Sequence, residues 1–387
     1  MQNLWSDEEA KKFTTDLDLR VYTSNLLGRS DELVLHGGGN TSVKSVVKGE
    51  EVLLVKGSGW DLVSIKAEGF APVKISTLLE MAQLKTLSDT DMVSGQKKAM
   101  LDPSAPNPSV EAILHALIPY KVVDHTHADA VVTISNSKNG IENIKKVFPN
   151  FLIVPYVMPG FILARTVYEM TQGLDWDSID GIILHNHGIF TFDNDAKKSY
   201  NKMIEAVSKA EEFLSQHAKI ESFKIDPREF DMQSLQQKVG AGFINTNQSD
   251  LALSYASSDD LKAKVTRGVL TPEHIIRTKR HPLVLVDAGM DVELDRYKQE
   301  YKKYFDTFSS DEIMLDSNPK YAVIKDFGVV SFGKTQKEAD VINDIVEHTM
   351  MAVLRADKLG GYESISLKDS FDMEYWELEQ NKLKKTQ

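Results

Sequence analysis

The chain has 387 residues, of which 42% are hydrophobic and 26% are charged, a composition typical of an ordinary globular protein. Its formal net charge of −12 argues against a nucleic-acid partner, which normally requires a basic surface. No apolar run approaches the roughly 18 residues that a membrane span requires, and the acidic N-terminal residues lack an apolar signal segment, so we expect a cytoplasmic protein with no membrane partner.

The length exceeds that of one typical hydrophobic core and favours two domains. We expect a catalytic domain over residues 1–225 and a smaller C-terminal α/β domain of unassigned role over residues 261–387. Between them, residues 226–260 are rich in glutamine, asparagine, serine and glycine, which is typical of a connecting segment.

The first domain alternates between predicted helices and strands. Apolar spacing predicts helices over residues 6–27 and from 195 to about 223, and a third helix opens at Pro108, because proline suits the first helical position. Strands are predicted over residues 33–47, 52–56, 122–135, 151–157 and 182–192. Since the connections are short, we expect an α/β fold with a mainly antiparallel sheet flanked by helices.

Two His-x-His elements, His125 with His127 and His185 with His187, lie in predicted strands. Residues i and i+2 of a strand face the same side, so each pair can direct two imidazoles at one divalent metal. A lone strand histidine is more often a core residue, but two on one face favour metal ligands. Because a catalytic zinc site usually has three protein ligands, we predict His125, His127 and His187, with His185 as the competitor for the third position.

The chain has no cysteine, so a metal must be held by imidazoles and carboxylates. Glu111 lies in the first turn of the helix that opens at Pro108, and His115 is one turn further along the same face. An isolated acidic residue at this position usually complements the helix dipole. With a His-x-His strand so close in the sequence, Glu111 instead favours a role as metal ligand or proton shuttle.

Two glycine-rich segments, Gly37-Gly38-Gly39-Asn40 and Gly57-Ser58-Gly59, offer backbone N–H groups that can approach a phosphate closely. Ser109 adds a hydroxyl at a helix N-terminus. Each feature alone is usually only a turn, but together they indicate an anion site. Neither segment matches the dinucleotide or P-loop pattern, so the sequence does not support a nucleotide cofactor.

Residues 181–192 and 321–332 share a pattern of apolar strand, glycine and apolar strand, followed by a turn and a long helix. At the offset of 140, Lys325 and Phe327 stand where His185 and His187 stand in the first copy. A second copy would therefore have lost its metal ligands. Such patterns also recur by chance in α/β proteins, so the C-terminal domain is either a degenerate repeat or an unrelated unit.

Taken in order, six segments resemble the class II aldolase and adducin family of zinc-dependent sugar-phosphate lyases, over roughly residues 10–220: HGGGNTSVK, VKGSGWDL, NPSVE, DHTHAD, VPYVMPG and LHNHGIF. The chain is most similar to the aldolase portion of bifunctional rhamnulose-1-phosphate aldolase/short-chain dehydrogenases. That similarity continues through RGVLTPEHIIRTKR and FDMEYWELEQNKL, without a dinucleotide fingerprint.

The resemblance implies retro-aldol cleavage of a ketose 1-phosphate, such as rhamnulose 1-phosphate, to dihydroxyacetone phosphate and an aldehyde. It implies that His125, His127 and His187 bind Zn²⁺ or another divalent metal, which acts as a Lewis acid on the substrate oxygens. Glu111 would move the proton at the carbon beside the carbonyl. The family also suggests a homo-oligomer, namely a tetramer.

The resemblance further implies a phosphate site and leaves some residues without a role. His115 and His185 would support the metal centre from outside its ligand set. Family aldolases protonate the leaving alkoxide with a tyrosine of a neighbouring subunit, but no tyrosine lies between His127 and Pro155, and the role is not transferred to Tyr156. The implied phosphate-binding residues are Asn40, Ser58, Gly59 and Ser109.

Two other functions fit the same residues. A pentulose-phosphate 4-epimerase would share the metal site but recombine its intermediates instead of releasing them. An adducin-like binding module would keep the fold without catalysis, although such a module has no physical reason to retain three histidines and Glu111 in register. Release of free products separates the first from an aldolase, and bound metal separates the second.

A cationic stretch stands in the C-terminal domain. A basic run is usually a solvated surface, but this one could instead meet a substrate phosphate. An unchanged Michaelis constant for Arg277→Ala with a phosphorylated ketose would exclude that alternative. The stretch comprises Arg267, His274, Arg277, Lys279, Arg280 and His281.

Overall fold

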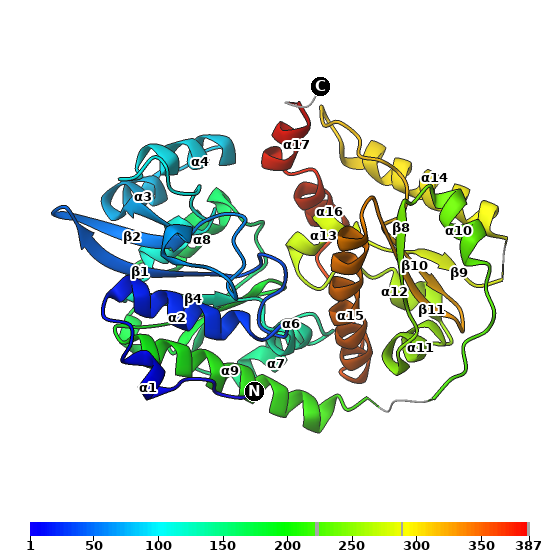
Figure 1. Ribbon diagram of the computed structural model, residues 1–387, viewed down its shortest axis with the longest axis horizontal. Coiled ribbons are helices and arrows are strands. Elements are labelled where there is room, and N and C mark those ends of the chain that lie inside the picture. The colour runs from blue at the N-terminus through cyan, green and yellow to red at the C-terminus, as the bar shows by residue number, and fades with distance from the viewer. Residues whose placement is uncertain (221–223, 288, 385–387) are drawn as a thin grey trace. The chain divides into compact units, whose positions relative to one another are not determined.

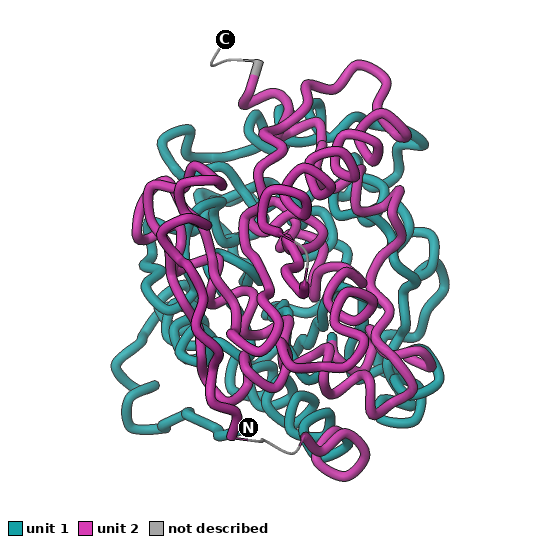
Figure 2. The backbone as a smooth tube through the Cα atoms, turned by 90° about the vertical axis from the view of Figure 1, so that its right-hand side faces the viewer, with its two compact units in different colours: residues 1–132, 141–213 teal, residues 133–140, 214–387 magenta. Residues whose placement is uncertain are grey.

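The computed structural model describes residues 1–220, 224–287 and 289–384. The chain forms two compact units, which Figure 2 shows in different colours. Unit 1 comprises residues 1–132 and 141–213, and unit 2 comprises residues 133–140 and 214–387. The main boundary therefore falls at 213 rather than at the expected position, 225. Within the described residues, no helix is both long enough and apolar enough to cross a membrane.

Unit 1 is built on a seven-stranded sheet in the order β3-β2-β1-β4-β7-β6-β5. Figure 1 labels β1, β2 and β4 of this sheet. Every neighbouring pair is antiparallel except β5 and β6, which are parallel. The predicted mainly antiparallel α/β fold is thereby confirmed. The strands are β1 (Asn40–Val47), β2 (Glu50–Lys56), β3 (Phe70–Lys74), β4 (Val122–Thr126), β5 (Phe151–Val154), β6 (Gly181–Leu184) and β7 (Gly188–Asp193).

Helices cover both faces of this sheet because its strands alternate buried side chains between two cores. Leu53 and Val55 of β2 pack with Leu78 and Ile113 in one core, whereas Val52 and Leu54 belong to another. The elements outside the sheet, some of which run into unit 2, are α1 (Asp7–Ala10), α2 (Asp16–Gly28), η1 (Ala67–Gly69), α3 (Ile75–Gln83), α4 (Asp89–Lys98), α5 (Ala112–Leu117), α6 (Asp129–Ser135), α7 (Gly140–Val147), α8 (Phe161–Met170), η2 (Trp176–Ser178) and α9 (Ala196–His217).

Unit 2 contains a smaller, four-stranded sheet in the order β8-β11-β10-β9. One face carries a core that includes Leu283, Ile324, Val330 and Leu294. The elements are α10 (Met232–Val239), β8 (Phe243–Asn247), α11 (Asp250–Ala256), α12 (Leu261–Val265), η3 (Pro272–His274), α13 (Ile275–Thr278), β9 (Leu283–Leu285), α14 (Met290–Phe308), β10 (Tyr321–Ile324), β11 (Gly328–Gly333), α15 (Gln336–Lys358), α16 (Leu367–Glu374) and α17 (Glu377–Lys384).

The small sheet repeats the order of four strands of the large one. β8-β11-β10-β9 matches β4-β7-β6-β5, and in both sheets only the last pair is parallel. The hairpin registers also agree, because Leu184 pairs with Gly188 and Ile324 pairs with Gly328. Both turns contain a residue with positive φ, 58° at Asn186 and 56° at Asp326. Descent of both sheets from one duplicated unit remains a prediction.

Several predicted elements differ from the structure. Residues 226–260 hold α10, β8 and α11, and β8 is hydrogen-bonded to β11, so the expected connecting segment is part of unit 2. Its polar residues misled us because β8 has few fully buried positions. The predicted strand over 122–135 ends at Thr126 and is followed by α6, since a short apolar run fits a buried helix as well as a strand.

Other differences concern turns and helix ends. The predicted helix over 6–27 is two helices, α1 and α2, and the predicted strand over 33–47 begins only at Asn40. The predicted strand over 182–192 is a hairpin, β6 and β7. The third helix begins at Ala112 rather than at Pro108, which instead bridges Gly57. Helix α9 ends at His217, and the predicted end at 223 lies outside the described residues.

Candidate metal centre

Two segments of unit 1 bring three histidines together. His125 lies in β4 and His127 lies one residue beyond its end, and their Nε2 atoms are 3.0 Å apart, so the two side chains face the same side, as predicted. His187 comes from the tight turn between β6 and β7, where Asn186 has φ 58°. Antiparallel pairing of β4 with β7 places that turn beside the end of β4.

One potential ligand nitrogen from each of His125, His127 and His187 lies within 4.8 Å of the other two. The Nε2 atoms of His125 and His127 are 3.0 Å apart. A tetrahedral metal about 2.1 Å from each nitrogen requires nitrogens about 3.4 Å apart, so the three imidazoles are close to what one ion needs. The side chains of His125 and His187 are 0% and 4% exposed.

Two residues of β7 fix the orientation of the His125 ring. Its Nδ1 lies 3.0 Å from the carbonyl oxygen of Ile189, so Nδ1–H donates there and Nε2 carries the lone pair that faces His127. The ring also stacks on Phe190, with centroids 4.0 Å apart and planes 15° apart. Both supports come from β7, the strand paired with β4.

Glu111 directs its carboxylate into the same group. Its Oε2 lies 3.4 Å from His125 Nε2, and its Oε1 lies 3.7 Å from His187 Nε2. Glu111 is 6% exposed and stands at the N-cap of α5, not inside the first turn as predicted. Oε1 has no hydrogen-bond partner among the described residues. A buried carboxylate oxygen facing imidazole nitrogens fits a bound cation.

Asn40 positions Glu111 through a buried hydrogen-bond network. Asn40 Nδ2 donates to Glu111 Oε2 at 2.6 Å and to Ser109 Oγ at 3.1 Å. The Oδ1 atom of Asn40 contacts His115 Nε2, and His115 Nδ1 lies 2.7 Å from Ser42 Oγ. Complete burial lowers the pKa of His115 well below its ordinary 6.5, so its imidazole is neutral. His115 thus holds Asn40, and through it Glu111.

His185 takes no part in this group of three. It lies in the same turn as His187 but is not in the strand that the prediction required, so the i, i+2 rule does not apply to this pair. Its backbone N–H donates to the carbonyl oxygen of Val154. Burial lowers the pKa of His185, and the negative charge of Glu142 opposes that shift.

The four predicted phosphate-binding residues lie along connected backbone segments. Ser109 Oγ accepts from Asn40, and the Ser109 N–H donates to the carbonyl oxygen of Lys56. The N–H of Ser58 donates to the carbonyl oxygen of Asn107, and Ser58 and Gly59 are exposed. The backbone donors of both serines are therefore used within the fold, so a phosphate would need their hydroxyls.

Lys56 is a candidate site residue that the sequence did not suggest. It is 4% exposed, and its Nζ donates to the carbonyl oxygen of Gly37 at 2.9 Å, which joins the two glycine-rich segments. Burial lowers the pKa of Lys56 to about 8, against the opposing charges of Asp61 and Glu111. The available signal was a lysine directly after four apolar strand residues.

The glycines near the histidines leave no room for a side chain. A Cβ at Gly188 would lie 3.0 Å from His125 Cε1 and 2.5 Å from the carbonyl oxygen of Thr126. A Cβ at Gly38 would lie 3.3 Å from His127 Nδ1, and Gly39 has φ 63°. The glycine-rich segment 37–40 therefore packs against the histidine strand, a role that the phosphate interpretation did not include.

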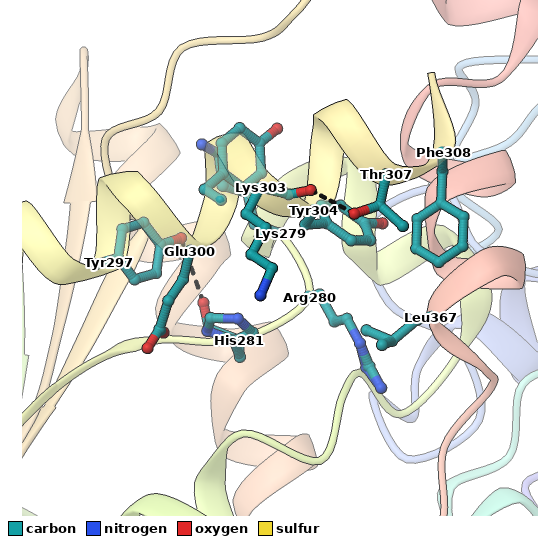
Figure 3. A pocket seen from close by; sticks show the side chains of 11 residues that line it. Lys279, Arg280, His281, Tyr297, Glu300, Lys303, Tyr304, Thr307, Phe308 and Leu367 are labelled. Carbon is teal, nitrogen blue, oxygen red and sulfur yellow. Dashed lines mark hydrogen bonds between the residues drawn. The ribbon is translucent and has the colours of Figure 1, made fainter. Parts of the chain in front are cut away.

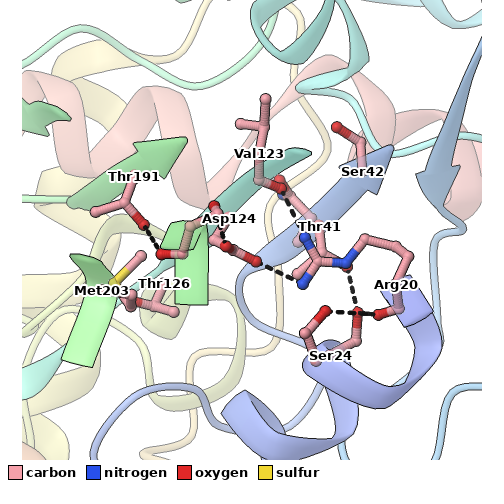
Figure 4. Close-up of polar contacts among 12 residues, drawn as sticks. Arg20, Ser24, Thr41, Ser42, Val123, Asp124, Thr126, Thr191 and Met203 are labelled. Carbon is pink, nitrogen blue, oxygen red and sulfur yellow. Dashed lines mark hydrogen bonds and ion pairs between the residues drawn. The ribbon is translucent and has the colours of Figure 1, made fainter. Parts of the chain in front are cut away.

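A buried ion pair supports β4 from the opposite side (Figure 4). Arg20 Nη2 lies 2.6 Å from Asp124 Oδ1, and both side chains are fully buried. Ser199 Oγ also donates to Asp124 Oδ2. Because Asp124 immediately precedes His125, this pair fixes the strand that carries two of the three imidazoles. No local sequence pattern marks Arg20 as a buried residue.

Three imidazoles with an adjacent carboxylate form a donor set suited to a divalent first-row metal. Such a set leaves a coordination position for a substrate oxygen and keeps a carboxylate within reach of a substrate proton. Zinc, manganese, iron and cobalt all accept such donors.

Comparison with known proteins agrees with this geometry. Residues 19–214 match the family model described as "Class II Aldolase and Adducin N-terminal domain", and residues 231–383 match the model described as "Aldolase class II, second domain". The first match contains every residue of the metal centre described above. The second lies in unit 2.

Two individual proteins are similar to this chain. One is an uncharacterized oxidoreductase, YuxG, of Bacillus subtilis (strain 168), which is 28% identical over 424 residues; the match covers 99% of this chain and 60% of that protein. The other is the solved N-terminal class II aldolase domain of a conserved protein from Thermoplasma acidophilum. It is 42% identical with a TM-score of 0.51, and the match covers 55% of this chain and 99% of that domain.

Proposed function

This chain belongs to the class II aldolase and adducin family, and from that membership we propose that it is a metal-dependent aldolase that cleaves a ketose 1-phosphate. The products are dihydroxyacetone phosphate and an aldehyde. Rhamnulose 1-phosphate is the substrate class that the sequence resemblance favours. The proposal concerns this chain alone, which spans 60% of the length of its Bacillus subtilis relative.

One observation carries the proposal: the buried carboxylate of Glu111 faces the three convergent imidazoles, while Asn40 forms a hydrogen bond with one of its oxygens. Glu111 Oε2 accepts from Asn40 at 2.6 Å, and Oε1 is directed toward His187. A protein that only needed this fold would gain nothing from burying four such groups together, since each loses its hydration. The arrangement therefore supports catalysis over a binding module.

His125, His127 and His187 would hold the divalent metal through ring nitrogens. When bound, the ion supplies Lewis-acid chemistry that makes the carbon–carbon bond beside a carbonyl easier to break. Glu111 holds and moves the substrate proton at Oε1, because Asn40 occupies Oε2. The neutral His115 keeps the amide of Asn40 turned so that its Nδ2 faces Glu111.

The phosphate would be bound by hydroxyls and a buried ammonium. Ser109 is hydrogen-bonded to Asn40, and the Lys56 ammonium lies under the glycine-rich segments that include Ser58 and Gly59. A cation held in a low-dielectric site interacts strongly with a phosphate. We therefore add Lys56 to the phosphate residues expected from the sequence.

The test is a turnover assay on the metal-loaded chain. A panel of ketose 1-phosphates, beginning with rhamnulose 1-phosphate, is incubated with the protein, and release of dihydroxyacetone phosphate is coupled to a dehydrogenase. We expect Glu111→Gln to lower kcat by about 10²–10⁴ with its metal content unchanged. The exposed Glu51 provides a matched control, since Glu51→Gln removes a carboxylate of β2 outside the centre.

The same assay separates the alternatives. Interconversion of pentulose phosphates without free triose would identify an epimerase. Metal-free protein that folds and turns over no substrate would identify a binding module. We also propose a homo-oligomer, namely a tetramer, and a monomer in light scattering would contradict it.

A further inference from the structure

Unit 2 contains a cavity of about 280 Å³ that the proposed metal chemistry does not use. It is lined by residues of the segment 279–281 and by one face of α14 (Figure 3). Lys279, Arg280 and His281 provide polar groups, whereas Tyr304 and Phe308 provide aromatic surface. Small-molecule sites typically combine an apolar lining with a few such convergent polar groups.

Lys279 is held in an unusual backbone conformation. Its φ of 59° and ψ of −179° lie in a region that is occupied almost only by glycine. The residue is also 4% exposed, which is rare for lysine. A strained backbone that buries an amine at a cavity wall is typical of functional sites rather than of surface loops.

The amine of Lys279 contacts a connected set of aromatic and acidic groups. Its Nζ donates to the carbonyl oxygen of Asp316 and lies 3.7 Å from the ring centroid of Tyr301. The hydroxyl of Tyr301 donates to Glu374 Oε1 at 2.8 Å and lies 2.7 Å from the hydroxyl of Tyr375. Glu374 is 2% exposed. Within the described residues, no salt bridge involves Lys279 or Arg280, although the negative charges of Glu374 and Asp316 act on Lys279.

Burial shifts the protonation equilibria of both Lys279 and Glu374. Burial lowers the pKa of the Lys279 ammonium and raises the pKa of the Glu374 carboxyl. The lowered pKa increases the fraction of Lys279 that is a neutral amine with a lone pair. Lysines with a pKa lowered by burial are the ones that proteins use to form imines.

We propose that Lys279 forms a reversible imine with a small carbonyl compound that carries an anionic group. The Nζ lone pair attacks the carbonyl carbon, a carbon–nitrogen bond forms, and the resulting hydroxyl leaves as water. Water in the open cavity gives one proton to the departing oxygen and takes one from nitrogen, so the net reaction is amine plus carbonyl to imine plus water. Arg280 pairs with the anionic group, and Tyr304 and Phe308 contact the apolar part.

The experiment uses the full chain and 4-carboxybenzaldehyde, an anionic aromatic aldehyde, with sodium cyanoborohydride at neutral pH. Peptide mass spectrometry then follows reductive alkylation of each lysine in the wild-type protein, so the readout does not depend on whether a variant folds. Lys303 is the matched control, because it lines the same cavity but is exposed. We expect Lys279 to be alkylated at least about tenfold faster than Lys303, because each unit of lowered pKa increases the neutral amine about tenfold.

Two variants test the other parts of the proposal. Arg280→Met should slow labelling of Lys279 by 4-carboxybenzaldehyde severalfold and leave labelling by uncharged benzaldehyde unchanged. Lys303→Met should leave Lys279 labelling unchanged. The proposal is overturned if Lys279 of the wild-type chain is labelled no faster than Lys303, or if Arg280→Met affects both aldehydes equally. None of these readouts depends on the metal centre, so failure of the proposed aldolase activity would leave them intact.

Discussion

Replacing Gly188 by alanine tests whether the metal centre depends on close packing between two strands. Gly188 begins β7, and an added Cβ would lie 2.5 Å from the carbonyl oxygen of Thr126, 3.0 Å from His125 Cε1 and 3.1 Å from His127 Cδ2. Ordinary contacts begin at 3.4 Å, so backbone or both rings must move. Overpacking of this kind costs about 1–3 kcal/mol of folding stability.

The larger effect should fall on metal binding. Displaced supports of metal-binding histidines typically cost about 10–100-fold in affinity, so we expect Gly188→Ala to lose at least tenfold in affinity for Zn²⁺. Competition with a chromophoric chelator measures the affinity, and urea unfolding of the metal-free protein measures stability separately. Gly289→Ala is the control, because a Cβ there meets nothing within 4 Å. An unchanged Zn²⁺ affinity of Gly188→Ala would refute this reasoning.

Three further predictions concern buried groups of unit 1. Arg20→Met should lower the free energy of unfolding by about 3–5 kcal/mol in urea titrations, because it leaves Asp124 buried without its partner. Adding Asp124→Leu should recover most of that loss. A loss below about 1 kcal/mol for Arg20→Met alone would contradict this prediction. Lys56→Met should raise the Michaelis constant for a phosphorylated ketose about tenfold at unchanged metal content, and an equal effect on a substrate without phosphate would exclude a phosphate role. The pKa of His115 is lower in the folded protein than its ordinary 6.5, so unfolding takes up a proton in acid: its contribution to stability is complete above pH 6.5 and falls by about 1.4 kcal/mol per pH unit below it. Unfolding of His115→Gln between pH 4 and 7 should show a shallower slope than the wild type, and identical slopes would count against a neutral buried imidazole.

The histidine cluster shows which part of the site can be predicted from local sequence. His125 and His127 were predicted from strand alternation, which holds to the end of β4 at Thr126 and places His127, one residue further, on the same side as His125. His187 was expected as third ligand, but the expected pairing with His185 on a strand face was wrong, because Asn186 adopts a positive φ and the chain turns there. The turn at His185-Asn186-His187 contains neither glycine nor proline, so no residue type separates it from the apolar strands on either side.

The burial of charged residues could not be predicted from the sequence for a different reason. Arg20 lies in a helix that also contains two aspartates and a threonine, and nothing local marks it as the fully buried partner of Asp124, about a hundred positions away. Lys56 and Lys279 likewise look like ordinary lysines, although each is 4% exposed. Such pairings depend on which segments meet in the fold. Their desolvation also makes them informative, since a buried lysine has a free-energy cost that a solvated one does not have.

The second sheet indicates what this strand arrangement requires for folding. By strand register, His125 of β4 corresponds to Thr246 of β8, because they pair with Phe190 and Val330 at equivalent positions of β7 and β11. The turn residue His187 corresponds in the same way to Phe327, between β10 and β11. The same strand order and register thus form without imidazoles at these positions. Because the sheet does not need the histidines of unit 1, and burying them beside Glu111 costs hydration energy, we propose a bound ion as the physical reason for keeping them together.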